Sequence, residues 1–371
     1  MAFLLPSAAA RLRFFRPLPR APITAALDVA LAGSANVSFA AAGDLGTQIP
    51  VASAASLTVV AAGNLGVAVP LSGAASVAIT SAGALDTNIA ISGAANISFV
   101  AAGVLGVQIP LLSASTVSVT AAGNLGVAVP LAAAASIAIT AAGDVTTNIA
   151  LGAASTVVVT VAGDLSVAVP LSAASNISVT ATADLGTSIP LVGAASVAIT
   201  SAGDLGTGTN LSGAATVTLV AAGDLSVAVP LLSGAAVSVS AVGNLGVSIP
   251  LAVAASVSIA SAGDLSTGTQ LAGAASLSVA MSGVLGVVVP LASAASIGIT
   301  ALGDLQTAVP SASAASLAIT AAGSLDSVSP GQINAPGLEF SLPVSRAHYT
   351  LLSARPHYTI GSSKLHFTAR A

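Results

Sequence analysis

Apolar and small residues alternate with a period of two along most of the chain. Val77 and Ile79 flank Ala78, and Val67 and Val69 alternate in the same way shortly before. Many of the apolar residues are β-branched. This pattern is typical of β-strands that bury one face. It therefore predicts short strands along most of the chain.

The alternation belongs to a repeat of fixed length. From Leu31 to Pro330 the sequence divides into 15 units of 20 residues, without insertion or deletion. Each unit has two similar halves, such as GAASVAIT and GDLGVAVP. Glycine recurs at the third and thirteenth positions, where it marks turns. Each unit is thus predicted to form strand, turn, strand and turn, at an equivalent place in a stack or spiral.

Two all-β architectures fit this repeat. In a single-chain β-solenoid each unit is one coil, and the coils stack about 4.8 Å apart. In an intertwined trimeric β-fibre each unit is one step along an axis that three chains share. Prolines that end most units, such as Pro50 and Pro70, have to lie in turns of a solenoid, because proline removes a ladder hydrogen bond. A free solenoid would also expose long uncharged surfaces, which packing between chains would bury. We expect an elongated fibrous repeat and favour the intertwined homotrimer over the solenoid.

Charge and composition exclude several classes of function. Charged residues make up 5% of the 371 residues and aromatic residues 2%, and there is no cysteine. The missing thiols exclude disulfides, zinc-finger spacing and thiol catalysis. Residues 31–330 hold ten aspartates and no lysine or arginine, so we expect no nucleic-acid partner. Mean hydropathy is +0.99, yet Gly, Ser, Pro, Asn or Asp interrupts every long apolar run, so no membrane span is expected.

One position of the unit is mostly acidic or amide. Its aspartates are Asp44, Asp144, Asp164, Asp184, Asp204, Asp224, Asp264 and Asp304, and its asparagines are Asn64, Asn124 and Asn244. A calcium site needs six to eight oxygen ligands, and one such residue per unit is too sparse. A side chain that accepts backbone N–H groups in an Asx-turn explains why Asp and Asn exchange. We predict a structural role for this column.

The other polar residues provide few of the groups that metal binding or catalysis needs. His348, His357 and His366 could gather around a metal in a trimer, but each lies in a repeated strand beside a basic residue, which is more typical of a surface ladder. The repeat contains no His or Lys that could activate a hydroxyl nucleophile, and no paired carboxylates. We expect no enzymatic activity, no cofactor and no metal site. A column of threonines, which raises ice binding as a further reading, contains Thr80, Thr120, Thr140, Thr160, Thr180 and Thr200.

Two parts of the chain, the repeat and the C-terminal segment, resemble known protein families. Residues 223–251, GDLSVAVPLLSGAAVSVSAVGNLGVSIPL, resemble the shaft repeats of viral triple β-spiral fibres. Near the C-terminus, RAHYT, RPHYT and KLHFT recur every nine residues, with EFS as a degenerate copy before them. These basic, aromatic strands resemble those of minor tail and tail-fibre proteins of actinobacterial bacteriophages. The resemblance implies a virion tail protein and transfers no catalytic residue.

The sequence thus predicts three parts: an N-terminal segment, 1–30, that attaches to a partner or caps the repeat, a β shaft, 31–330, and a C-terminal β cap, 331–371. We expect a structural virion protein, a phage tail fibre or minor tail protein, whose partners are other tail proteins and the host cell surface. The alternative is a secreted or surface-displayed β-solenoid, an adhesin or ice-binding protein, located outside the cell or on its surface.

Overall fold

The structure, a computed structural model, consists of two compact units, Met1–Ala183 and Asp184–Ala371. It describes residues 3–5, 25–31, 35–50, 55–70, 72–90, 92–110, 115–130, 134–150, 152–170, 174–190, 193–209, 214–230, 234–250, 255–268, 275–288, 295–309, 315–321, 325–330, 339–342, 348–351, 357–360 and 366–369. All eight lysines and arginines, and most of the predicted N-terminal segment, lie outside these residues.

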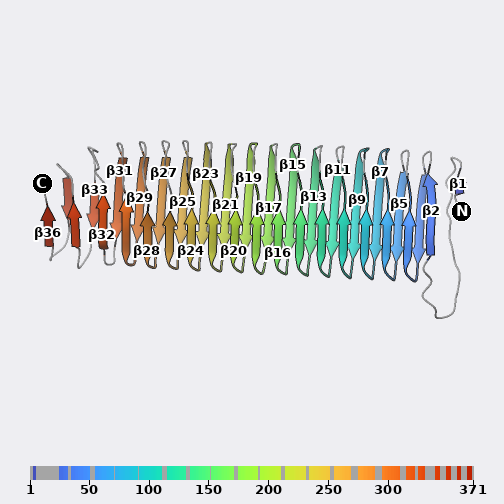
Figure 1. The fold of residues 1–371 in the computed structure, drawn as a ribbon, viewed down its shortest axis with the longest axis horizontal. Coiled ribbons are helices and arrows are strands. Elements are labelled where there is room, and N and C mark those ends of the chain that lie inside the picture. Colours follow the sequence, from blue (N-terminus) through green and yellow to red (C-terminus); the bar gives the residue numbers. More distant parts are fainter. Residues whose placement is uncertain are drawn as a thin grey trace. The chain divides into compact units, whose positions relative to one another are not determined.

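Long and short strands alternate along the first unit (Figure 1). Its long strands are β3 (Ala35–Ala41), β5 (Ala55–Ala61), β7 (Ala75–Ser81), β9 (Ala95–Ala101), β11 (Ser115–Ala121), β13 (Ala135–Ala141), β15 (Ser155–Val161) and β17 (Ser175–Ala181). Its short strands are β4 (Leu45–Gln48), β6 (Leu65–Ala68), β8 (Leu85–Asn88), β10 (Leu105–Gln108), β12 (Leu125–Ala128), β14 (Val145–Asn148) and β16 (Leu165–Ala168). Two further strands precede them, β1 (Phe3–Leu5) and β2 (Ala25–Leu31); β1 pairs with β2, and β2 with β4.

The second unit repeats the alternation. Its long strands are β19 (Ala195–Ser201), β21 (Ala215–Ala221), β23 (Ala235–Ala241), β25 (Ala255–Ser261), β27 (Ala275–Met281), β29 (Ala295–Ala301) and β31 (Ala315–Ala321). Its short strands are β18 (Leu185–Ser188), β20 (Leu205–Gly208), β22 (Leu225–Ala228), β24 (Leu245–Ser248), β26 (Leu265–Gly268), β28 (Leu285–Val288), β30 (Leu305–Val309) and β32 (Leu325–Pro330). Four strands follow: β33 (Glu339–Leu342), β34 (His348–Leu351), β35 (His357–Ile360) and β36 (His366–Ala369).

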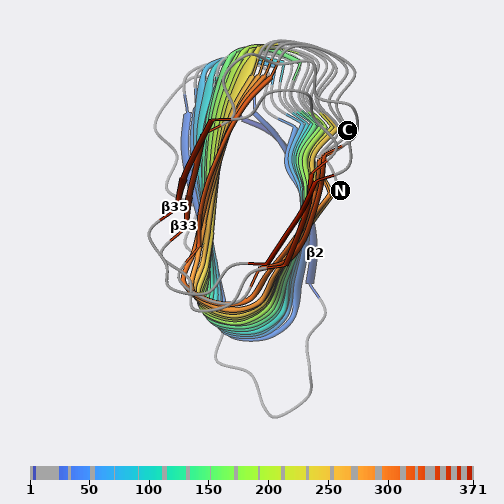
Figure 2. The same ribbon diagram turned by 90° about the vertical axis from the view of Figure 1, so that its left-hand side faces the viewer.

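Within each unit, the strands of neighbouring coils pair in parallel, with a register of twenty residues. Val117 lies opposite Ile137, and Thr120 lies opposite Thr140. Within each unit the long strands therefore form one sheet and the short strands another, and each coil closes as two walls joined by turns (Figure 2). This is a β-solenoid. The all-β repeat of strand, turn, strand and turn is confirmed, and the chain takes the single-chain architecture that the sequence analysis placed second. A trimer stays a prediction about the assembly.

The alternating apolar residues build the inside of the coils. In the coil of β11 and β12, Val117 and Val119 point inward from the long strand, and Leu125, Val127 and Val129 from the short-strand side; all five are at most 4% exposed. Burial of each such side chain stabilises the fold by about 1.5–3 kcal/mol. Since the inward residues of successive coils stack in register, one row of small, branched side chains packs on the next.

A close backbone approach explains the glycine in the turn after most long strands. A Cβ built on Gly143 would lie 2.7 Å from the carbonyl carbon of Gly123 and 2.8 Å from Asn124 Oδ1. Real Cβ atoms essentially never come that close to a backbone atom. The same clash exists at Gly63 and Gly163. Glycine is therefore favoured at this position, because neighbouring turns stack in contact; Ala183 is the exception.

The nine-residue repeats at the C-terminus continue the pairing. β33 pairs with β31, and β35 pairs with β33 so that Glu339 lies opposite His357. β34 and β36 pair with each other in a separate two-stranded sheet, with His348 opposite His366. Two nine-residue repeats thus make one coil of eighteen residues. The predicted strand character of HYT and HFT is confirmed.

The described ranges contain strands, turns and bends and no helix, so none of them forms a helix that could serve as a membrane span.

Candidate functional site

The Asp and Asn column forms a hydrogen-bonded ladder from coil to coil. The backbone N–H of Asn244 donates to Asp224 Oδ1 at 2.8 Å, and the N–H of Asp224 donates to Asp204 Oδ1 at 2.9 Å. The same bond recurs at 2.9–3.3 Å between positions 64 and 44, 84 and 64, 144 and 124, 164 and 144, 204 and 184, 264 and 244, and 284 and 264. The predicted structural role is confirmed, but the donor belongs to the next coil instead of the residue's own turn.

This geometry explains the exchange of Asp and Asn. Only one side-chain oxygen, Oδ1, accepts the N–H, and both residue types carry it. In the second unit the column also lines a groove of about 700 Å³ beside the short strands, together with Gly206, Ser226 and Ser266. Among the described residues, no group of three or more His, Asp or Glu side chains is placed to hold a metal ion.

The three histidines are divided between two sheets. His348 and His366 lie in register on β34 and β36, whereas His357 lies on β35 opposite Glu339. The fold of one chain thus does not bring the three residues to one place.

The outward residues of the long strands form a second surface, which we call the long-strand face. It consists of the sixth, eighth and tenth residues of each unit, for example Thr216, Thr218 and Val220 in residues 211–230. In all 15 units these positions hold only Ser, Thr, Asn, Ala, Val or Gly. The face is therefore uncharged along its whole length and carries short side chains only.

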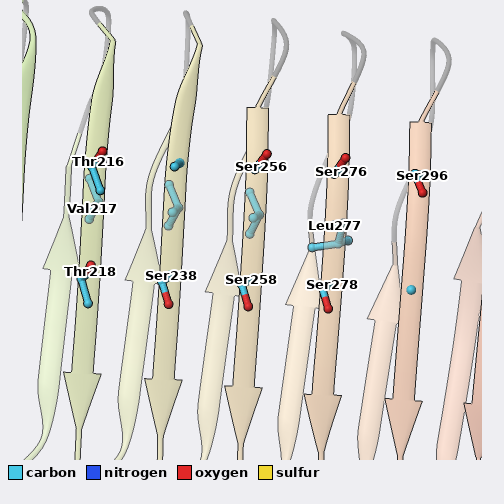
Figure 3. A pocket seen from close by; sticks show the side chains of 14 residues that line it. Thr216, Val217, Thr218, Ser238, Ser256, Ser258, Ser276, Leu277, Ser278 and Ser296 are labelled. Carbon is cyan, nitrogen blue, oxygen red and sulfur yellow. The ribbon is translucent and has the colours of Figure 1, made fainter.

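A groove of about 510 Å³ follows the long-strand face across β21, β23, β25, β27 and β29. Two rows of side chains flank it (Figure 3). One row contains Thr216, Ala236, Ser256, Ser276 and Ser296, and the other contains Thr218, Ser238, Ser258, Ser278 and Gly298. Because each row adds one residue per coil, its members repeat about every 4.8 Å along the groove.

In the first unit the long-strand face carries the threonine column. Thr120 lies opposite Thr140, Thr140 opposite Thr160, and Thr160 opposite Thr180. Thr120, Thr140 and Thr160 are exposed and Thr180 is half-buried. The fold thus turns the predicted column into four hydroxyls in register on one face.

Aspartate is the only acidic or basic residue type in residues 31–330, which contain no His, Lys, Arg or Glu. Seven described threonines are buried inside the coils. One of them, Thr87, donates its hydroxyl to the carbonyl of Gly106. The buried Oγ1 atoms of the other six have no hydrogen-bond partner among the described residues: Thr47, Thr147, Thr187, Thr207, Thr209 and Thr267. These threonines occupy positions where other coils carry Val or Ile.

Sequence reasoning missed the groove and the buried threonines. Both become visible when the sequence is written in rows of twenty, because each column then shows one side of the coil. Alternation alone distinguishes inward from outward residues, but it does not show which outward residues of distant units lie side by side.

No family model, no curated protein and no solved structure matches the chain.

Proposed function

We propose that this protein is a structural component of a virion tail, a tail fibre or minor tail protein, with the solenoid as a stiff shaft. The observation that carries the structural role is the uniformity of the coils. Within each unit, successive coils pair through the same backbone bonds and the same buried columns, and most of them also through the Asp and Asn ladder. A shaft consists of equivalent coils, whereas a catalytic site needs coils that carry different side chains.

The virion assignment draws on the C-terminal segment. Its basic, aromatic nine-residue repeats are the part of the chain that resembles phage minor tail proteins. Their strands β33 and β35 extend the sheet that ends with β31, so the segment can form the tip of the shaft. We propose that three copies form the fibre, that its ends contact other tail proteins, and that one end reaches the host cell surface.

The test is peptide mass spectrometry of purified particles from a lysate of the source organism. The proposal predicts that peptides of this chain co-purify with tail proteins through a density gradient. Antibodies against the chain should label the tail in electron micrographs. Peptides found only in the culture medium or on the cell surface, with none in the particles, would refute the virion role and favour the secreted alternative.

Ice binding is the second candidate, and the threonine column of the first unit favours it. Its hydroxyls repeat at a fixed spacing on an uncharged face, which suits a regular array of bound water. The measurement is thermal hysteresis of the purified chain, with Thr140→Lys and Thr160→Lys combined as the test variant. Thr146→Lys, on the outer side of a short strand, is the control. Hysteresis that the test variant alone abolishes would establish ice binding, and no hysteresis in the parent chain would exclude it.

A further inference from the structure

We infer that the long-strand face of the second unit is a contact surface for another copy of this chain. The inference does not rest on the virion assignment, because a secreted solenoid would expose the same face. Three observations carry it: the distribution of charge between the two sides of the coil, the area of the face, and the groove along it.

Charge is confined to one side of the coil. All ten aspartates of residues 31–330 lie in the turn before a short strand or on a short strand. Asp86 on β8 and Asp326 on β32 are the two within strands. The long-strand face has no charged residue in any of the 15 units. Charged side chains keep protein surfaces apart in solution, and the cores of interfaces are depleted of them.

The face is large enough for a stable contact. The second unit has seven long strands of seven residues each. With about 4.8 Å between strands and 3.3 Å per residue, they cover about 780 Å². A typical specific interface buries about 800 Å² on each partner. The second unit alone therefore meets the usual size.

The side chains on the face suit close packing. Ser, Thr, Ala and Gly lose little rotamer freedom when they become buried, in contrast to Lys, Arg or Glu. The hydroxyls that flank the groove can donate and accept hydrogen bonds across a contact. Stacked sheets with short side chains pack about 10 Å apart.

The groove identifies the partner. Its walls repeat once per coil, so the row of side chains that fills it has to repeat at the same spacing over five coils. A second copy in parallel alignment supplies such a row, for example Val220, Ser240, Ala260, Ala280 and Thr300 from its own long-strand face. Row and groove then stay matched along their length, because both follow the same coil repeat.

The test compares two triple variants of the full chain by light scattering after gel filtration, over a dilution series. One places lysine in the groove: Ser238→Lys, Ser258→Lys and Ser278→Lys. The other places lysine on the short-strand side: Ser226→Lys, Ser248→Lys and Ser266→Lys. All six serines are solvent-accessible in the single chain. We expect the parent and the short-strand variant to have a multiple of the 34.8 kDa chain mass, and the groove variant to have the mass of one chain with an unchanged strand signal in circular dichroism.

A parent chain that is monomeric at every dilution, or a groove variant that keeps the mass of the parent, would overturn the inference. Should the groove variant fail to fold, hydrogen exchange of the parent chain decides. Peptides from residues 234–240 and 255–260 should lose protection on dilution, while peptides from residues 225–228 and 245–248 keep theirs. Equal behaviour of the two sets would overturn the inference as well.

Discussion

At the scale of single residues, the turn glycines allow neighbouring turns to stack in contact. A glycine at this position lets the carbonyl of one turn lie against the next, where a Cβ would overlap the backbone. By contrast, a Cβ on Gly126, at an outward position of a short strand, would meet no atom within 4 Å. Of these two glycines in neighbouring coils, Gly126 has room for a side chain and Gly143 has none.

We predict that Gly143→Ala lowers the free energy of unfolding by about 1–3 kcal/mol, because overlapping backbone atoms have to move apart. Gly126→Ala should leave it unchanged or raise it by up to about 1 kcal/mol, since alanine restricts the unfolded chain. Urea unfolding followed by circular dichroism measures both. Equal destabilisation by the two variants would contradict the stacked-turn geometry.

Buried threonines are a second feature of the residue scale. Thr207 is 6% exposed, and its Oγ1 has no hydrogen-bond partner in the described coils. Its neighbour in the next coil is Val227. A buried hydroxyl without a partner destabilises the folded state, and valine offers nearly the same shape without this cost.

We therefore expect Thr207→Val to raise the free energy of unfolding by about 1 kcal/mol. The exposed Thr146 is the matched control, and Thr146→Val should change the free energy of unfolding by no more than about 0.5 kcal/mol. Thermal and urea unfolding would both report the difference. A loss of stability in Thr207→Val would mean that the hydroxyl has a partner inside the coil.

At the scale of elements, the Asp and Asn ladder joins turns that are twenty residues apart. Sequence reasoning identified the column and its structural role from the exchange of Asp44 with Asn64 and Asn124. It placed the donor in the residue's own turn, because local hydrogen bonds are the ones that sequence spacing reveals. The observed donor lies one coil away, and only the stacking of coils brings it near.

For the ladder we predict that Asp224→Ala lowers the free energy of unfolding by about 1 kcal/mol, because the N–H of Asn244 loses its acceptor. Asp224→Asn keeps Oδ1 and should be at least as stable as the parent chain, since it also removes repulsion from the neighbouring Asp204. Added calcium should leave the melting temperature of the parent unchanged. A rise that depends on Asp224 would instead favour a metal site.

The strands themselves were predictable in detail. Alternation of Val77 and Ile79 with small residues gave their position and their inward side, and glycine gave the turns. The coil also explains why the unit length never varies, because one extra residue would turn the inward residues of a strand outward.

At the scale of the whole molecule, alternation could not decide between the two architectures. A strand that buries one face has the same pattern whether its partner is the next unit of its own chain or a unit of another chain. The uncharged outward positions led to the intertwined fibre. In the solenoid, the same positions form the long-strand face, for which we propose contact between separate chains.

The measurement that tests the solenoid most directly is disulfide formation between neighbouring coils. Ala128 and Asn148 lie opposite each other on the outer side of β12 and β14, away from the long-strand face. Adjacent strands are about 4.8 Å apart, within the Cα distances of about 4.4–6.8 Å that a disulfide spans. The chain has no native cysteine, so only the introduced pair can react.

The solenoid predicts that Ala128→Cys and Asn148→Cys in one chain form a disulfide within that chain, seen by mass spectrometry and as a single-chain band on a non-reducing denaturing gel. A mixture of chains that each carry one of the two cysteines, refolded together, should give no link between residues 128 and 148. Efficient disulfide-linked chains in that mixture would contradict the solenoid and restore the intertwined fibre.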